Sequence, residues 1–387
     1  MKKLVCSIII LALLAAAFAG CGASGSNSGA SSGGETVYKI GASGPLTGGA
    51  AIYGNAARNG ATIAVEEINA LGGIQLELRY EDDEHDPEKA VNAYNTLKDW
   101  GMQLSLGTVT STPGAAVAPK YFEDRIFAIT PSASSVAVIQ GNDNVLQMCF
   151  SDPSQGAASA QYISDNSLGT KIAVIYKNDD VYSSGIFETF MAEASARGMD
   201  IVSTTTFTED SQNDFSVQLT EARNQGADLI FLPMYYTPAS LIFQQARSMD
   251  FAPKYFGVDG MDGILTLEGF DTSLAEGVML LTPFNADAND ERTKNFVSKY
   301  QEAYGEIPNQ FAAGGYDSIY AIYEAIQQDG SITPGLSAEE TCEKLIAKFT
   351  SFSFDGVTGE NTTWSTEGLV SKGPKGMIIR NGVYVGM

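Results

Sequence analysis

Histidine is scarce in this chain, and its scarcity excludes several kinds of chemistry. The one histidine, His85, lies in an acidic run over 81–87, which we expect to form a solvated turn before a helix. A zinc site needs several His or Cys ligands at close spacing, which one histidine cannot supply. The acidic run also lacks the spacing of an EF-hand calcium loop. We therefore predict no metal site.

Signatures of catalysis are missing as well. The predicted folded part has no G-x-S-x-G motif, because Gly41-Ala42-Ser43-Gly44 has the wrong spacing, and no phosphate-binding G-x-x-x-x-G-K-[ST] motif. We predict that the chain is not an enzyme and uses no cofactor.

Basic residues are few, with 23 Lys and Arg against 46 Asp and Glu and a formal net charge of −23. A field of this sign repels nucleic acid and anionic lipid headgroups, so we predict no nucleic-acid partner.

Only one apolar run stands out, at 4–14, and it is too short to cross a bilayer comfortably. It follows Lys2 and Lys3 and precedes Ala17-Phe18-Ala19-Gly20-Cys21, an order typical of a secretory signal. The small residues before Cys21 resemble the bacterial lipobox. We predict a signal peptide over 1–20 and a lipid on Cys21, which would anchor an extracytoplasmic protein to the membrane. An ordinary signal peptide cleaved nearby is the alternative.

Residues 21–34 continue as a Gly/Ser-rich segment, which we interpret as a flexible tether. The folded part would begin near Glu35. It holds two cysteines, Cys149 and Cys342, flanked by core-like residues. We expect buried free thiols, with a bridge between them as the alternative.

From Glu35 onward, strand-like and helix-like patterns alternate, which is typical of parallel sheets covered by helices on both faces. We predict strands at 37–42, 74–81, 104–109, 127–130, 171–176, 201–207, 229–234 and 255–258. Helices are predicted between them, at 55–71, 87–100, 184–197, 215–225 and 239–249. A gap around 151–156 separates two similar series. The predicted fold class is therefore α/β, with two doubly wound parallel-sheet lobes.

The last hundred residues predict helices at 291–304, 314–328 and 338–349 and a hairpin around Asn381-Gly382. This tail cannot build a third core, so the chain must cross between the lobes several times. We expect lobe 1 to comprise 35–152 and 284–358, and lobe 2 to comprise 153–283 and 359–387, joined by a multi-strand hinge.

Hydroxyl-rich loops follow two predicted strands of the first series. Thr110-Ser111-Thr112-Pro113-Gly114 follows one, and Pro131-Ser132-Ala133-Ser134-Ser135 follows the next. Ligands of open parallel sheets gather at the carboxyl ends of strands. Helix-start N–H groups with nearby hydroxyls suit an anion such as a carboxylate. The Ser and Thr side chains could equally be plain helix caps.

The second series places other groups at its strand ends, namely Tyr182, Tyr235 and Asp259. An acid with aromatic rings could hold an ammonium and an apolar side chain. Alternatively, Asp259 is a turn residue before Gly260 and the tyrosines are packing residues.

Taken in order, these residues resemble the leucine/isoleucine/valine-binding family of periplasmic binding proteins, of type I fold. The most specific matches run from Ile40 to Gly48, at Tyr53-Gly54 and Asn59-Gly60-Ala61, from Glu67 to Ile74, and at Asp82-Asp83, Asp86-Pro87, Ser154-Gln155-Gly156 and Gln245-Ala246-Arg247. The resemblance covers essentially the whole chain from Tyr38.

The resemblance implies a clamp that closes on an amino acid. Ser111 and Ser134 match the positions that hold the α-carboxylate. The Ser132 carbonyl, Ser134 and Asp259 match those that hold the ammonium. Tyr53, Tyr182, Tyr235 and Phe311 match the positions that line the pocket for the ligand side chain. With Ala133, which lies between two of the serines, the implied ligand residues are Tyr53, Ser111, Ser132, Ala133, Ser134, Tyr182, Tyr235, Asp259 and Phe311.

Two departures from the family pattern matter. Asp259 stands where branched-chain binders often have Glu, one methylene longer, which leaves the ligand's identity open. His85 and Thr110 stand where some of them have a disulfide.

The resemblance further implies a permease and an ATPase of an ABC importer as partners, and we expect a monomer. A ligand-sensing receptor subunit is an alternative, and an aromatic acid, a short amide or a small peptide is an alternative ligand.

Overall fold

The computed structural model describes residues 37–387. The predicted signal peptide, Cys21 and the tether lie outside the described residues.

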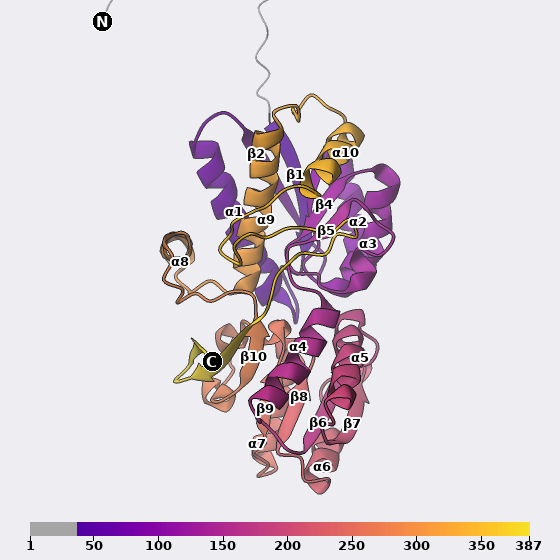
Figure 1. Ribbon diagram of the computed structural model, residues 1–387, viewed down its shortest axis with the longest axis vertical. Coiled ribbons are helices and arrows are strands. Elements are labelled where there is room, and N and C mark those ends of the chain that lie inside the picture. The colour runs from indigo at the N-terminus through magenta and orange to yellow at the C-terminus, as the bar shows by residue number, and fades with distance from the viewer. Residues whose placement is uncertain (1–36) are drawn as a thin grey trace, which may run out of the picture. The chain divides into compact units, whose positions relative to one another are not determined.

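The first sheet has five parallel strands in the order β2-β1-β3-β4-β5, as expected for a doubly wound lobe (Figure 1). Its strands are β1 (Val37–Gly44), β2 (Gln75–Asp82), β3 (Leu104–Gly107), β4 (Phe127–Thr130) and β5 (Val145–Gln147). The helices that pack on it are α1 (Ala51–Ala70), α2 (Pro87–Trp100), α3 (Ser111–Asp124), α9 (Gln310–Asp329) and α10 (Ala338–Phe349). We call these elements lobe 1.

Strand alternation explains why helices cover both faces of this sheet. Tyr38, Ile40 and Ala42 of β1 are buried in one core together with residues of α1 and α9. Gly41 points the other way, toward Leu97 and Met102 at the end of α2. Successive residues of a strand face opposite sides, so a buried strand needs apolar or small residues at every position.

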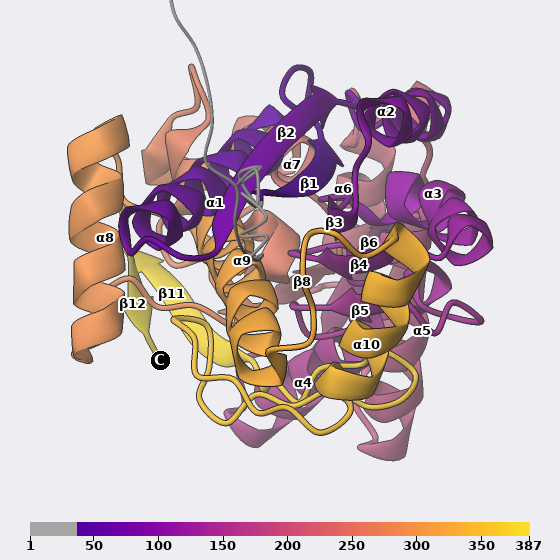
Figure 2. The same ribbon diagram turned by 90° about the horizontal axis from the view of Figure 1, so that it is seen from above.

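Helices α1 and α9 lie side by side at very short range (Figure 2). A Cβ atom on Gly60 would lie 1.9 Å from the carbonyl oxygen of Ala312, and one on Gly315 would lie 2.2 Å from that of Ala57. Both glycines are therefore required by the contact between the helices.

The second sheet has seven strands in the order β12-β11-β10-β9-β8-β6-β7. The strands β6 (Ile172–Lys177), β7 (Ile201–Phe207), β8 (Leu229–Leu232), β9 (Lys254–Gly257) and β10 (Met279–Thr282) run parallel. β11 (Lys375–Arg380) and β12 (Val383–Gly386) form the predicted hairpin, which is added antiparallel to β10. The helices of this lobe 2 are α4 (Asp152–Asp165), α5 (Val181–Ala196), α6 (Ser216–Asn224) and α7 (Tyr236–Ser248).

The chain passes between the two lobes three times. It leaves lobe 1 after β5, returns after β10 by way of α8 (Glu291–Tyr304), and leaves again after α10 to reach β11 (Figure 1). The predicted multiple crossing is thus present. None of the helices described over 37–387 combines the length and apolarity that a membrane crossing requires.

Several elements differ from the sequence prediction. Strands β5 and β10 have three and four residues and were not predicted. The three residues of β5 are too few for a recognisable pattern. Helix α4 begins at Asp152, where a gap was expected, because its opening Asp-Pro-Ser-Gln-Gly has the composition of a turn. Helices α1, α5, α7 and α9 begin three or four residues earlier than predicted. Proline and polar residues are tolerated in a first helical turn, so they do not mark its true start.

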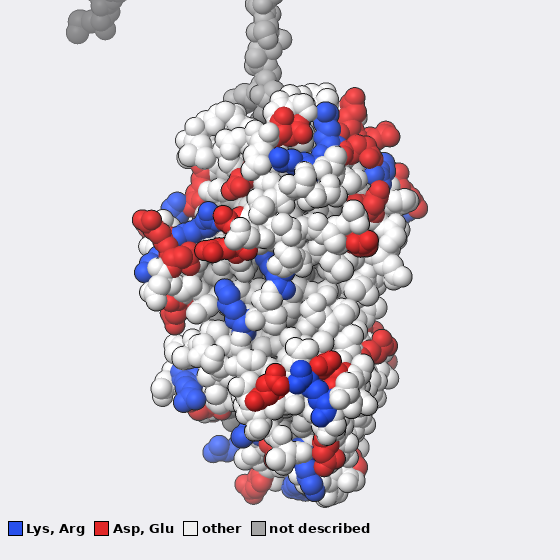
Figure 3. Space-filling view, viewed as in Figure 1, with Lys and Arg blue, Asp and Glu red and all other residues white. Residues whose placement is uncertain are grey.

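Cys149 and Cys342 are free and buried, as expected. On the face shown in Figure 3, acidic side chains lie over both lobes among scattered Lys and Arg, in keeping with the net charge of −23.

Candidate functional site

The two hydroxyl loops of lobe 1 meet at the carboxyl edge of its sheet. Ser111 is the first residue of α3, and its side-chain oxygen accepts a hydrogen bond of 3.1 Å from the backbone N–H of Ser135. Ser111 and Ser134 are buried, at 1% and 0% exposure. The expected proximity of the two loops is therefore present.

Ser132 and Ala133 lie in the same loop, but most of their polar groups are already bonded. The Ser132 hydroxyl donates to the carbonyl of Val109 at 2.6 Å. The Ala133 N–H donates to the Thr130 hydroxyl at 2.9 Å, and the Ala133 carbonyl accepts from the Gln147 amide at 3.0 Å. These bonds fix the loop. Of the polar groups of Ser132 and Ala133, the Ser132 carbonyl is left free to accept a hydrogen bond from a ligand.

Three candidate residues of lobe 2 form one connected group. The Tyr182 hydroxyl donates to Asp259 Oδ1 at 2.6 Å and accepts from the Gly260 N–H at 2.9 Å. The rings of Tyr182 and Tyr235 are stacked, with centroids 4.6 Å apart. Burial raises the pKa of Asp259 to about 6, against an opposing effect of the Tyr182 hydrogen bond.

Tyr53 and Phe311 bring lobe 1 into contact with this group. The ring centroid of Tyr53 lies 4.3 Å from that of Phe311 and 5.4 Å from that of Tyr235. The Tyr53 hydroxyl donates to the Gly260 carbonyl and accepts from the Tyr236 N–H at 3.0 Å. Both residues had been selected from the family resemblance alone.

The first turn of α4 lies between the serine loop of lobe 1 and Asp259, a role that was not predicted from the sequence. The Asp152 N–H donates to the Ser134 carbonyl at 3.0 Å, and Gln155 Oε1 accepts from the Asp259 N–H at 3.2 Å. Gln155 had entered only as part of a family motif. In sequence Asp152 opens a run with the composition of a turn, so the one signal for it was its place at the expected lobe boundary.

Several polar atoms at this point are buried without a hydrogen bond of good geometry to the protein. They are both carboxylate oxygens of Asp152, the Ser134 hydroxyl and the Gln155 side-chain N–H₂. Burial raises the pKa of Asp152 well above its ordinary value, and the charges of Asp259 and Asp180 raise it further, while the nearby Ser134 and Ser135 side chains lower it. Buried polar groups are normally paired, so this cluster of donors and acceptors is complementary to a small molecule carrying both charges.

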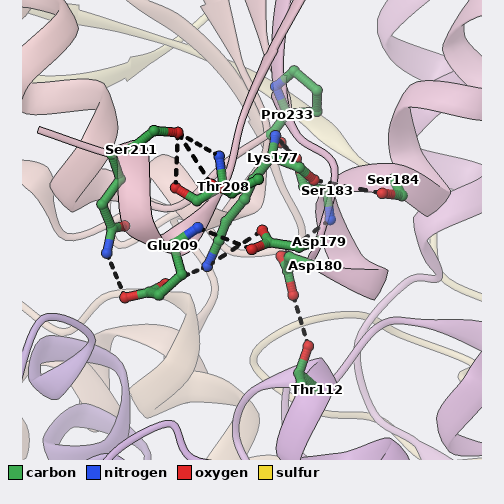
Figure 4. A network of polar contacts seen from close by, with 11 residues as sticks. Thr112, Lys177, Asp179, Asp180, Ser183, Ser184, Thr208, Glu209, Ser211 and Pro233 are labelled. Carbon is green, nitrogen blue, oxygen red and sulfur yellow. Dashed lines mark hydrogen bonds and ion pairs between the residues drawn. The ribbon is translucent and has the colours of Figure 1, made fainter. Parts of the chain in front are cut away.

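Hydrogen bonds join the two lobes at the outer edge of the same region. In Figure 4 the Thr112 hydroxyl, near the start of α3, reaches Asp180, which caps α5. This donor–acceptor distance is 2.8 Å. The Thr237 hydroxyl also donates to the Gly49 carbonyl at 2.6 Å. Lys177, of the same lobe as Asp180, pairs with Glu209 (Figure 4).

His85 lies in the expected turn, but its side chain is only partly exposed, so the expectation of a solvated position was wrong. It does precede α2, but its ring packs edge-on against Tyr235 of lobe 2, with centroids 5.4 Å apart. Burial lowers its pKa, against the opposing charge of Asp180. Its polar sequence neighbours gave no sign of a partner from the other lobe. His85 Nδ1 also lies 2.9 Å from the Thr110 hydroxyl, so a hydrogen bond joins the two positions where some branched-chain binders have a disulfide.

Within residues 37–387, no group of three or more His, Cys, Asp or Glu side chains is placed to hold a metal ion.

Comparison with known proteins agrees with this fold. Residues 37–373 match the family described as periplasmic binding protein. The Leu/Ile/Val-binding protein BraC3 of Rhizobium johnstonii is 30% identical over 296 residues, which cover 76% of this chain and 79% of that protein.

Two solved structures superimpose with a TM-score of 0.81 each, and each match covers 90% of this chain and 97% of the other. The leucine-binding protein LivK of Thermotoga maritima is 28% identical, and the branched-chain amino acid transporter substrate-binding protein LivJ of Streptococcus pneumoniae, in complex with isoleucine, is 27% identical. On its two-lobed α/β architecture and this match along nearly all of its described length, the chain belongs to the periplasmic binding protein family.

Proposed function

We propose that this chain is the extracytoplasmic solute-binding subunit of an ABC importer and captures a zwitterionic amino acid of the branched-chain type between its lobes. The observation that carries the proposal is the cluster of buried polar atoms of Ser134, Asp152 and Gln155 beside Asp259. The cluster contains donors for a carboxylate and acceptors for an ammonium, and the rings of Tyr53, Tyr235 and Phe311 border it.

Each end of the ligand would have its own partners. The Ser134 hydroxyl, the Ser111 side chain and the N–H groups at the start of α3 suit the α-carboxylate. Asp259, the Ser132 carbonyl and Ser134 suit the ammonium, with Asp152 as a second acid nearby. The apolar side chain would pack on the rings of Tyr53, Tyr182, Tyr235 and Phe311. Ala133 would contribute through the shape of its loop.

Binding would be coupled to closure, because neither lobe alone offers the full set of partners. The serine loops belong to lobe 1, whereas Asp259 and Tyr182 belong to lobe 2. A ligand that bridges them shifts the population toward the closed arrangement. The lobe boundaries expected from the sequence are 35–152 with 284–358 and 153–283 with 359–387. The packing of α9 and α10 on the first sheet and of β11 on the second supports this exchange of segments. The second boundary lies later than 358, because the Trp364 indole donates to the carbonyl of Gln147 in β5 and the Gln147 N–H donates to the Gly368 carbonyl.

Isothermal titration with leucine and two matched analogues tests the proposal. The analogues are 4-methylpentanoate, which lacks the ammonium, and isoamylamine, which lacks the carboxylate. We expect leucine, isoleucine and valine to bind, and each analogue to compete with leucine only weakly, because each leaves one buried set of partners of the leucine site unpaired. Binding of aromatic carboxylates without any response to amino acids would contradict the proposal.

We further infer that the protein acts as a lipid-anchored monomer and delivers its ligand to a permease with its ATPase. The small residues before Cys21 support the anchor. Incorporation of an alkyne-tagged fatty acid into the wild type but not into Cys21→Ala tests the anchor, and sedimentation velocity with and without leucine tests the monomer. Impaired leucine uptake in cells that lack the protein would distinguish delivery from sensing.

A further inference from the structure

A second cavity of about 540 Å³ lies beside the crossing segments, apart from the site described above. None of the nine candidate ligand residues lines it. Its walls come from the first turns of α1, the segment after β9, the segment after β10, the end of α8 with the start of α9, and the β11–β12 hairpin. Sites for small molecules usually occupy about 300–1,000 Å³, so the cavity has a suitable size.

The walls of this cavity are mainly apolar. Ile52 and Leu265 face it from lobe 1 and lobe 2, and Phe284 lines it from the segment after β10. At its rim Ile307 and Val383 are 55% and 47% exposed, which is high for large apolar side chains. A ligand with an apolar body would cover this surface and gain the free energy of burying it.

All charged residues that line the cavity are acidic. They are Asp262, Asp287 and Glu306, and the lining includes no Lys, Arg or His. Asp262 is 5% exposed, and one of its carboxylate oxygens accepts a hydrogen bond of 2.9 Å from the Gln310 N–H. Asp287 and Glu306 are exposed. A cavity whose charged lining residues are all acidic repels carboxylates and attracts cations. The partly exposed ring of Tyr384 adds a favourable surface for an organic cation.

We propose that this cavity is a second small-molecule site, which takes an amine with an apolar body and no carboxylate. Its chemistry is distinct from that of the amino-acid site, where donors and acceptors are combined. Residues from both lobes line it, so its shape depends on how the lobes are placed.

Titration of the purified protein with tryptamine tests the proposal, with tryptophol and indoleacetate as neutral and anionic analogues of similar size. We expect one tryptamine per chain, weaker binding of tryptophol and no binding of indoleacetate. Saturating leucine should not displace the amine. Displacement by leucine, or equal binding of the amine and the acid, would overturn the proposal. Failure of leucine itself to bind would count against the proposed function and leave the amine result intact.

Val383→Trp is designed to fill the cavity from the exposed hairpin, and Val385→Trp is its matched control two residues along the same strand, outside the lining. We expect the first to weaken tryptamine binding by at least about tenfold through steric exclusion and the second to leave it unchanged. The double variant Asp287→Asn/Glu306→Gln, which changes exposed residues only, should also bind the amine less tightly. Unaltered tryptamine affinity in both the filled and the neutralised variant would refute the site.

Discussion

Asp259 is the residue whose charge the proposed function needs most. In Asp259→Asn the side chain keeps its size, but the charged partner of the ligand ammonium is lost. Hydrogen bonds to charged groups contribute about 1.5–3 kcal/mol, so we predict an affinity for leucine about 10- to 100-fold weaker, measured by titration calorimetry. The exposed Asp200→Asn, at the start of β7, should match the wild type. Wild-type affinity in Asp259→Asn would exclude the assigned role.

The raised pKa of Asp259, about 6, predicts how leucine binding depends on pH. The ammonium requires the carboxylate form, so affinity is lost as the pH falls through about 6. A carboxyl group with this pKa is about one-tenth ionised at pH 5, so the dissociation constant should rise about tenfold from pH 7.5 to pH 5. The Asp259→Asn variant should show a flatter profile, whereas His85→Gln should keep the wild-type one. Identical profiles in all three proteins would contradict the prediction.

The raised pKa of Asp259 affects the stability of the unliganded protein in the opposite direction: this contribution falls, and does not rise, with increasing pH. The folded state holds the Asp259 proton more tightly than the unfolded state, whose carboxyl has a pKa of 3.8. This contribution to stability is therefore present at low pH and is lost as the pH rises from about 4 to about 6.

How far the site could be predicted depended on where each residue lies in its element. Ser111, Ser134 and Asp259 follow strands, and the rule that ligands gather at strand ends selected them without any relative. Tyr53 and Phe311 lie in helix turns with no such mark, so only the resemblance identified them. Asp152 was missed because the three residues of β5 give no periodic signal to show that α4 also begins at a strand end.

At the scale of elements, the contact between α1 and α9 depends on glycine. A methyl group on Gly315 would overlap the Ala57 carbonyl, and backbone cannot yield as a flexible side chain does. Overpacking a tight contact costs about 1–3 kcal/mol and occasionally more, so we predict that Gly315→Ala lowers the free energy of unfolding by at least about 2 kcal/mol in denaturant titration. Gly335→Ala, with no atom within 4 Å of the added carbon, is the control and should change little.

The hydrogen bond between α3 and the cap of α5 should stabilise closure. Thr112→Val keeps the shape of the side chain and removes its donor to Asp180. A hydrogen bond to a charged group contributes about 1.5–3 kcal/mol, so leucine should dissociate about 10- to 100-fold faster in stopped-flow measurements. Thr96→Val, which alters a hydroxyl bonded within α2, is the control. An unchanged dissociation rate in Thr112→Val would show that this contact does not hold the lobes together.

Helix starts were predicted less well than helix bodies. Pro113 in α3 and Pro238 in α7 lie in first turns, where the missing N–H has no cost, yet in sequence they suggest a loop. The apolar periodicity that predicts a helix begins only after them.

For the whole molecule, closure predicts a change in dimensions on binding. We expect the radius of gyration from small-angle X-ray scattering to fall when leucine is added to the wild type and to stay constant in Asp259→Asn at the same leucine concentration. A decrease in both proteins would mean that closure does not require the acid.

The alternation of strands and helices was sufficient to predict two lobes, because each βα unit is local in sequence. The β10–β11 pairing joins residues about a hundred positions apart, and no local pattern reveals such a partner.

The three crossings also bear on how the chain reaches its native state. The Tyr38 hydroxyl of β1 donates to the carbonyl of Ile332, 294 residues later. Helix α9 packs in the same core as the Tyr38, Ile40 and Ala42 side chains of β1. During synthesis lobe 1 thus begins to appear first, but it is completed only after most of lobe 2 has emerged, because its covering helix α9 follows most of lobe 2 in the sequence. A chain that stays incomplete until its final residues arrive is well suited to being threaded through a narrow channel before it folds.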